Sequence, residues 1–341
     1  MGLQVKGLVS DRAKALVKLG GRPYLNTVSM ADLFHFCQDF GRAVGCKISL
    51  DLARIQKQLD KEGLKEEDKG ELVLQLERLQ GKREQYRAQI EQINKTVHPF
   101  NESNELQSGE EIQKGLTRSF TAISHIADDL EIDIGLAKAA KILNQIPDIA
   151  AGVVGWQEWL RTEMGEQTLD KTPEYSQWLE KALLPYAYWQ VHLTKVSGKK
   201  QDRSLRQYYS DRRTEAQLFF ERQPLGMLME ENLKEASVNW AFQMAATFHR
   251  SSSQVEGRNG YLAFVHHAQR GIPEQRQKVL TVVHNFDIRR TDGFTPAQRL
   301  FKKDFPDLFE FILENVKGFP PPRTRHKKLK RSFAIVSGGQ C

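Results

Sequence analysis

The sequence has few cysteines and no long apolar run. Its three cysteines, Cys37, Cys46 and Cys341, are too few and too scattered for a disulfide framework, which favours a reducing compartment. No apolar run approaches the ~20 residues that a membrane-spanning helix needs, and the first residues lack the apolar region and the cleavage site of a signal peptide. These absences exclude a disulfide-rich secreted protein and a membrane protein, and they predict a cytoplasmic location.

Sequence signatures of metal and nucleotide sites are missing as well. The pair His266 and His267, and the pair His35 and Cys37, lack the spacing of zinc ligands, so packing or DNA contact is the favoured interpretation. The chain contains no phosphate-binding glycine loop, no Gly-x-Ser-x-Gly nucleophile motif and no dinucleotide fingerprint. These patterns therefore point to no NTPase, serine hydrolase or dinucleotide-dependent enzyme.

Acidic residues are absent from the most basic stretch of the chain, residues 323–331. The 341 residues, about two domains by length, are 40% hydrophobic and 27% charged, which is typical of a water-soluble globular protein. The net charge is +7 and the sequence pI is near 9.2. The basic stretch either attracts polyanions through phosphate contacts or is a solvated tail. Its cations are Arg323, Arg325, Lys327, Lys328, Lys330 and Arg331.

The first 46 residues combine β and helical patterns. Residues 3–9 are apolar and partly β-branched, residues 12–20 favour a helix, and residues 24–30 fit a second strand. Asp32 follows at the position where a helix N-cap is expected. This part of the chain predicts a small α/β element.

From residue 48 to residue 250 the pattern is helical only. Apolar residues at alternating spacings of four and three predict two long helices, separated by a break at residues 63–70. We expect an antiparallel helical hairpin whose apolar seam packs on itself, with a dimerising coiled coil as the alternative. All five tryptophans follow within residues 156–240, where core packing is favoured over stacking on bases.

The pattern changes again after residue 251. A helix is predicted at residues 279–290, a turn at residues 291–301 and a final helix at residues 305–316. Three consecutive prolines, Pro320 to Pro322, then end the folded part.

Two acids are candidates for catalysis. Asp11 follows the first predicted strand, where a rigid element would fix its carboxylate at an open edge, as a hard cation requires, although a helix N-cap is the alternative. Glu256 lies in a serine-rich stretch, and Ser253-x-x-Glu256 also has the spacing of a capping box. The nearby glycines Gly257 and Gly260 disfavour a purely helical role and fit the close approach of another backbone.

Three segments together resemble bacterial insertion-sequence transposases of the three-carboxylate (DDE) class, which have an RNase H-like fold. The second-aspartate region of that family is similar to GLVSDRAKALVKL and DLFHFCQDFG. The corresponding region of Mutator-type transposases is more distantly similar to these segments. The family's catalytic-glutamate segment is similar to SSSQVEGRNGYLA, and the end of its domain is similar to HNFDIRRTDGFTPAQRLF, including Thr295, Pro296 and Ala297. The resemblance covers roughly residues 1–46 and 200–318.

The resemblance implies a mainly α fold with a small α/β part. That part is a partial RNase H-like core, interrupted by a large helical insertion that contains the long hairpin. The expected segments are 1–46, the core with the second Asp; 47–100, the hairpin; 101–250, the helical insertion; 251–318, the glutamate-bearing part of the core; and 319–341, a basic and weakly structured tail.

The implied activity is DNA strand cleavage and transfer at insertion-sequence ends, with Mg²⁺ or Mn²⁺ as the cofactor. Asp11 and Glu256 would be the catalytic, metal-binding acids. The expected DNA contacts are Arg258, Asn259, Arg289, Arg290 and the six tail cations. The implied partners are transposon ends and target DNA, and the implied location is the bacterial nucleoid.

One departure from the family concerns the first catalytic Asp, which lies upstream of the second in that fold. No acid precedes Asp11 here. We therefore expect a truncated or split transposase that is inactive alone, with a missing N-terminal half as a further partner. The alternative is a noncatalytic helical protein, derived from a transposase, that binds DNA or self-associates. A structural coiled-coil protein would leave Asp11, Glu256 and residues 295–297 unexplained.

Overall fold

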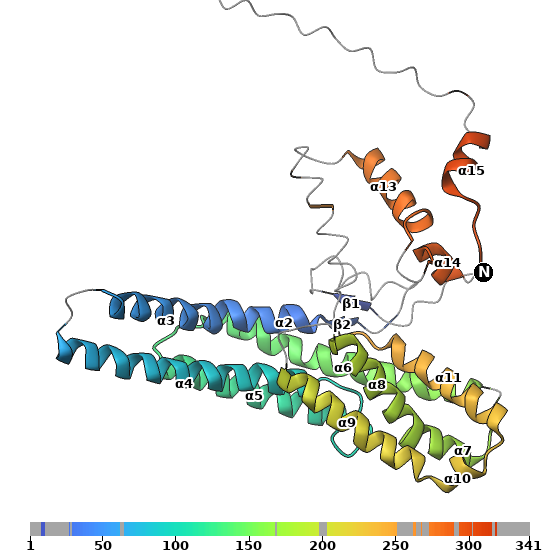
Figure 1. The fold of residues 1–341 in the computed structure, drawn as a ribbon, viewed down its shortest axis with the longest axis horizontal. Helices are drawn as coiled ribbons and strands as arrows, with labels where there is room; N and C mark the ends of the chain where they lie inside the picture. The colour runs from blue at the N-terminus through green and yellow to red at the C-terminus, as the bar shows by residue number, and fades with distance from the viewer. Residues whose placement is uncertain are drawn as a thin grey trace, which may run out of the picture. The chain divides into compact units, whose positions relative to one another are not determined.

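The computed structural model describes residues 8–10, 27, 29–61, 65–167, 169–197, 203–250, 262–263, 267, 273–289, 293–301, 303–315 and 318 (Figure 1). Contacts divide the chain into two units, Met1–Val255 and Glu256–Cys341. Most described residues are helical, so the predicted mainly α class is confirmed. No helix in the described ranges is both long and apolar enough to span a membrane.

The first unit is a bundle of long helices with two short strands. Its strands are β1 (Leu8–Ser10) and β2 (Ser29–Ala31). Its helical segments are α2 (Leu33–Phe40), η1 (Gly41–Gly45), α3 (Cys46–Leu59), α4 (Glu66–Thr96), α5 (Gly109–Asp129), α6 (Leu136–Glu166), α7 (Pro173–Trp178), η2 (Leu179–Leu183), α8 (Leu184–Ser197), α9 (Arg203–Glu221), α10 (Pro224–Leu228) and α11 (Glu231–Thr247). Figure 1 shows the long helices lying side by side, with α4 on α3 and α5, and α8 on α9 and α11.

The two strands are parallel. Leu8 pairs with Ser29, and Ser10 pairs with Ala31. Both strands lie where strands were predicted, although each ends one residue later than expected. Because parallel strands have their carboxyl ends at the same edge, the residues that follow Ser10 and Ala31 start from one side of the sheet.

The predicted helical hairpin is present, with one correction to its break. The first arm runs through α2, η1 and α3 without interruption, and the second arm, α4, packs along α3. Helix α4 already begins at Glu66, so residues 66–70 are helical instead of part of the break. Three acids in the first turn, Glu66, Glu67 and Asp68, favour this earlier start because they complement the positive end of the helix dipole.

The strands pack on α6 through a glycine. At Gly152 an added Cβ would lie 2.3 Å from the Cβ of Met30, so only glycine allows β2 to approach the helix this closely. The core of the bundle includes Trp178 and Trp189 as buried residues, while Trp156, Trp159 and Trp240 are partly buried against it. The tryptophans are therefore core residues, as predicted.

The second unit contains three described helices of six residues or more: α13 (Glu274–Phe286), α14 (Pro296–Phe301) and α15 (Leu308–Asn315). Helix α13 begins and ends earlier than predicted, and α14 lies in a stretch predicted as a turn. Helix α15 begins later than predicted, because Asp307 accepts hydrogen bonds from the amides of Phe309 and Glu310 and thereby caps it. Thr295 and Gln298 cap α14 reciprocally, with N–H to side-chain distances of 3.2 and 2.8 Å.

Candidate functional site

The carboxyl edge of β1 and β2 is the candidate site in the first unit. The amide of Asp32 donates a hydrogen bond to the carbonyl of Ser10 at 2.8 Å, which joins the end of β2 to the end of β1. Asp11 is the next residue after Ser10. Side chains at this edge start from rigid backbone, which favours a fixed geometry.

Asp32 has a structural role at this edge. Its carboxylate is buried and accepts hydrogen bonds from the amides of Phe34 at 2.7 Å and His35 at 3.2 Å. These bonds satisfy two of the free N–H groups that begin α2, so the predicted N-cap is confirmed.

Arg250 links the strand edge to the helical bundle. Its carbonyl accepts a hydrogen bond from the amide of Leu33, the first residue of α2, at 2.9 Å. Its guanidinium extends to the end of α4, where it donates to the carbonyls of Asn94 at 2.8 Å and Val97 at 3.3 Å. It also donates to the hydroxyl of Tyr209, on α9, at 3.1 Å. The chain is thus held at Arg250 both by its backbone and by its side chain.

A buried cluster of polar aromatic residues surrounds this guanidinium. His98 is fully buried; its Nδ1 lies 2.5 Å from the hydroxyl of Tyr188, and its Nε2 lies 3.2 Å from the hydroxyl of Tyr209 and 3.2 Å from Nη1 of Arg250. The ring of His192 lies against Tyr188, with a centroid distance of 4.3 Å. We call His98, Tyr188, His192, Tyr209 and Arg250 the buried cluster.

Burial and charge keep the two histidines of the buried cluster neutral. Desolvation, reinforced by the positive charge of Arg250, lowers the pKa of His98 well below 6.5. Desolvation also lowers the pKa of His192 strongly, with further contributions from Arg250, Lys195 and His249. Burial raises the pKa of the Cys37 thiol to about 12, so this cysteine is not a thiolate nucleophile at neutral pH.

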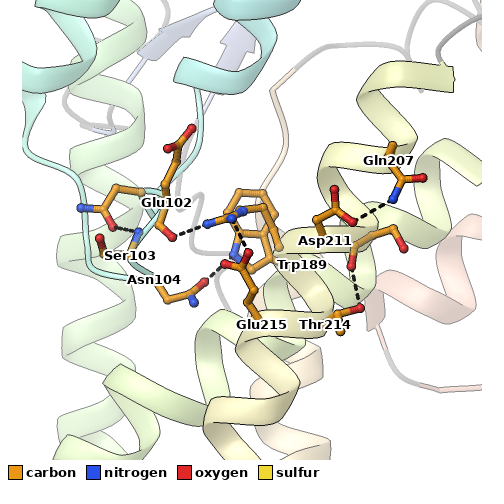
Figure 2. Close-up of polar contacts among 11 residues, drawn as sticks. Glu102, Ser103, Asn104, Trp189, Gln207, Asp211, Thr214 and Glu215 are labelled. Atoms are coloured by element: carbon orange, nitrogen blue, oxygen red, sulfur yellow. Dashed lines mark hydrogen bonds and ion pairs between the residues drawn. The ribbon is translucent and has the colours of Figure 1, made fainter.

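A second polar contact region fixes the loop between α4 and α5 (Figure 2). Asn104, which has a φ of 61°, accepts a hydrogen bond from Nε1 of Trp189 at 3.0 Å. Arg212, on α9, donates to the carbonyl of Glu102 and to the carboxylate of Glu215. These contacts tie one loop to α8 and α9.

Most of the predicted site residues lie outside the described residues. These are Asp11, Glu256, Arg258, Asn259, Arg290, Arg323, Arg325, Lys327, Lys328, Lys330 and Arg331. Arg289 is described: it is exposed, and its Nη1 donates to the carbonyl of Gly293 at 3.3 Å. Among the described residues, no group of three or more His, Cys, Asp or Glu side chains could hold a metal ion.

No pattern in the sequence singles out the buried cluster. Its members come from the end of α4, from α8, from α9 and from the residue at position 250, so no local pattern connects them. The available signal was weak: Arg250 ends an apolar helical stretch, where a lone charge needs a partner if it is buried.

Comparisons with known proteins add one match. No curated protein and no solved structure matches the chain. Over residues 179–328, less than half of its length, the chain is similar to a family of unknown function (DUF6399). This range includes four members of the buried cluster, Tyr188, His192, Tyr209 and Arg250, and all of α13, α14 and α15.

Proposed function

We propose that this protein acts on DNA as a member of the DDE transposase class, with β1 and β2 as part of an RNase H-like core. The observation that carries the proposal is the joining of three chain segments at one strand edge. The carbonyl of Ser10, the residue before Asp11, accepts a hydrogen bond from the amide of Asp32. The amide of Leu33 donates to the carbonyl of Arg250. The serine-rich stretch with Glu256 follows Arg250 in the sequence. Sequence positions about 240 residues apart thus start from the same edge.

The proposed catalytic residues are the carboxylates of Asp11 and Glu256. Carboxylate oxygens are suitable ligands for Mg²⁺ or Mn²⁺, which would supply charge neutralisation during cleavage of a phosphodiester. A helix or strand end gives such a ligand a rigid attachment, and Asp11 directly follows β1. Arg258, Asn259, Arg289, Arg290 and the tail cations would contact phosphates of the DNA.

A noncatalytic role in association is the second candidate. The observation that favours it is the exposed apolar surface of α15, which has no buried residue. The exposed fractions of its side chains include 64% for Phe309, 48% for Phe311 and 41% for Leu313. An exposed apolar patch of this kind is typical of interaction surfaces.

Metal binding tests the proposed acids without requiring turnover. Mn²⁺ binding to the full chain is measured by the relaxation rate of water protons, for the unchanged protein and for Asp11→Asn and Glu256→Gln. We expect each variant to bind Mn²⁺ at least about tenfold more weakly, because each removes one charged ligand. Glu67→Gln, an exposed acid in the first turn of α4, is the matched control and should leave binding unchanged. Equal affinity in all four proteins would contradict the proposed acid pair.

A further inference from the structure

The second unit contains a pocket around α14. The pocket has a volume of about 330 Å³. It is lined by Phe294, Gln298, Arg299, Lys303 and Asp304. All five residues are described, and they lie within eleven consecutive positions of the chain.

The charges that line this pocket favour an anion. Among its described lining residues, Arg299 and Lys303 provide a guanidinium and an ammonium group, and Asp304 provides a carboxylate. That carboxylate already accepts a hydrogen bond from Nε2 of Gln298 at 3.1 Å. Among the described lining residues the two cations outnumber the one carboxylate, and a guanidinium with an ammonium group suits phosphate oxygens.

The same pocket also contains an aromatic side chain, Phe294, whose neighbouring residues are hydrogen-bonded. Phe294 is 52% exposed, although it lines the pocket. The preceding residue, Gly293, has a φ of 82°, a backbone conformation that favours glycine. The carbonyl of Gly293 accepts a hydrogen bond from Nη1 of Arg289. On the other side, Thr295 is capped reciprocally with Gln298. Both neighbours of Phe294 are therefore fixed by hydrogen bonds.

We propose that this pocket binds one nucleotide unit of single-stranded DNA, with the base on Phe294 and its flanking phosphates at Arg299 and Lys303. An aromatic ring beside a basic groove is the combination by which proteins bind single strands without reading their sequence. A duplex keeps its bases stacked inside, so it would use the cations alone. The inference rests on the proposed function, to which it adds a separated strand as the ligand.

The test is the affinity of the full chain for a fluorescently labelled oligothymidine of twelve nucleotides, measured by anisotropy at several salt concentrations. Phe294→Leu should weaken binding at least about fivefold, because stacking of a base on an aromatic ring is lost. Phe294→Trp keeps a stacking surface and should retain the affinity. Lys303→Gln should reduce the slope of log affinity against log salt by about 0.7, the value for one phosphate contact to a single strand.

The matched control is Lys278→Gln. Lys278 is an exposed cation of the same unit, on α13, and it pairs with Glu274 at 2.8 Å. This change should alter the affinity by less than about twofold, because Lys278 does not line the pocket and its charge is already paired with Glu274. Far-UV circular dichroism of each variant verifies that the helices are retained.

Three outcomes separate the pocket from the proposed function. Unchanged affinity in Phe294→Leu and Lys303→Gln, or an equal loss in Lys278→Gln, would overturn the pocket while DNA binding stands. Binding to duplex DNA with none to the single strand would overturn the pocket only. Binding to neither form of DNA would overturn both proposals.

Discussion

His98 and His192 place two neutral imidazoles beside the partly buried guanidinium of Arg250. In the folded chain the pKa of each is held well below 6.5 by burial and by the charge of Arg250. In the unfolded chain each imidazole takes up a proton near pH 6.5. Between the two pKa values the unfolded state therefore binds more protons, and acid favours unfolding.

We expect the free energy of unfolding to be constant above about pH 7 and to fall as the pH drops below about 6.5. Each histidine contributes at most about 1.4 kcal/mol per pH unit, the value for one proton. Urea titrations at several pH values measure the slope. His192→Phe should reduce it, whereas His125→Gln, at an exposed position on α5, should not. An identical slope in both variants would contradict the assignment.

Arg250 should be the costliest single residue of the buried cluster to replace. Arg250→Met removes the donors that the carbonyls of Asn94 and Val97 and the hydroxyl of Tyr209 now use. Buried acceptors left without donors cost about 1–3 kcal/mol each, so we expect a loss of at least about 2 kcal/mol in a urea titration. Arg250→Lys keeps the charge and should lose less. Some buried charged groups can be replaced by apolar ones without loss of stability. An unchanged free energy of unfolding in Arg250→Met would show that Arg250 is such a group and contradict this prediction.

At the scale of single elements, the contact of β2 with α6 makes one glycine sensitive to substitution. Gly152→Ala brings a methyl group to 2.3 Å from Met30, so β2 or the helix must shift. We expect a loss of about 1–3 kcal/mol in the free energy of unfolding. Gly81→Ala is the control, because nothing lies within 4 Å of its added methyl group in the middle of α4, and it should stabilise the chain by up to about 1 kcal/mol. The same sign for both changes would contradict this contact.

The cap of α14 explains one of the segments that resemble transposases. Thr295 supplies the N-cap oxygen and Pro296 stands at the first helical position, where a missing N–H costs nothing. Thr295→Ala should destabilise α14 by about 1 kcal/mol, seen as faster hydrogen exchange at residues 298–301. Thr295→Ser keeps the hydroxyl oxygen and should exchange at the original rate. Equal exchange in both variants would show that the cap is dispensable.

For the molecule as a whole, we expect that the 341-residue chain alone does not cleave DNA. In-line displacement at a phosphodiester uses two ions that hold the attacking and leaving oxygens, and two acids hold them incompletely. Asp11 and Glu256 are the two acids proposed for this site. The assay follows nicking of DNA that carries the element's ends, with Mg²⁺ and then with Mn²⁺. Nicking that is abolished by Asp11→Asn and by Glu256→Gln would contradict this expectation and strengthen the transposase assignment.

Local patterns were sufficient for the elements whose causes are local. The hairpin of α3 and α4 follows from apolar spacing, the start of α2 from Asp32, and the core position of the tryptophans from their apolar neighbours. Helix ends were less predictable. Helix α4 begins before its apolar seam because three acids stabilise its first turn. Helix α14 lies in a stretch whose turn-forming residues predicted a turn. Asp11 and Glu256 remain predictions, since both lie outside the described residues.

The sequence by itself determined the helical class of this protein, because a periodicity of 3.6 residues acts within one turn and needs no distant partner. Only the tertiary structure decided which polar residues meet inside it. His98, Tyr188, Tyr209 and Arg250 are separated by up to 152 positions, yet they share hydrogen bonds in one buried place. Burial makes this meeting necessary, since a charge or a polar ring removed from water is stable only beside a partner, and that partner is chosen by the packing of whole helices.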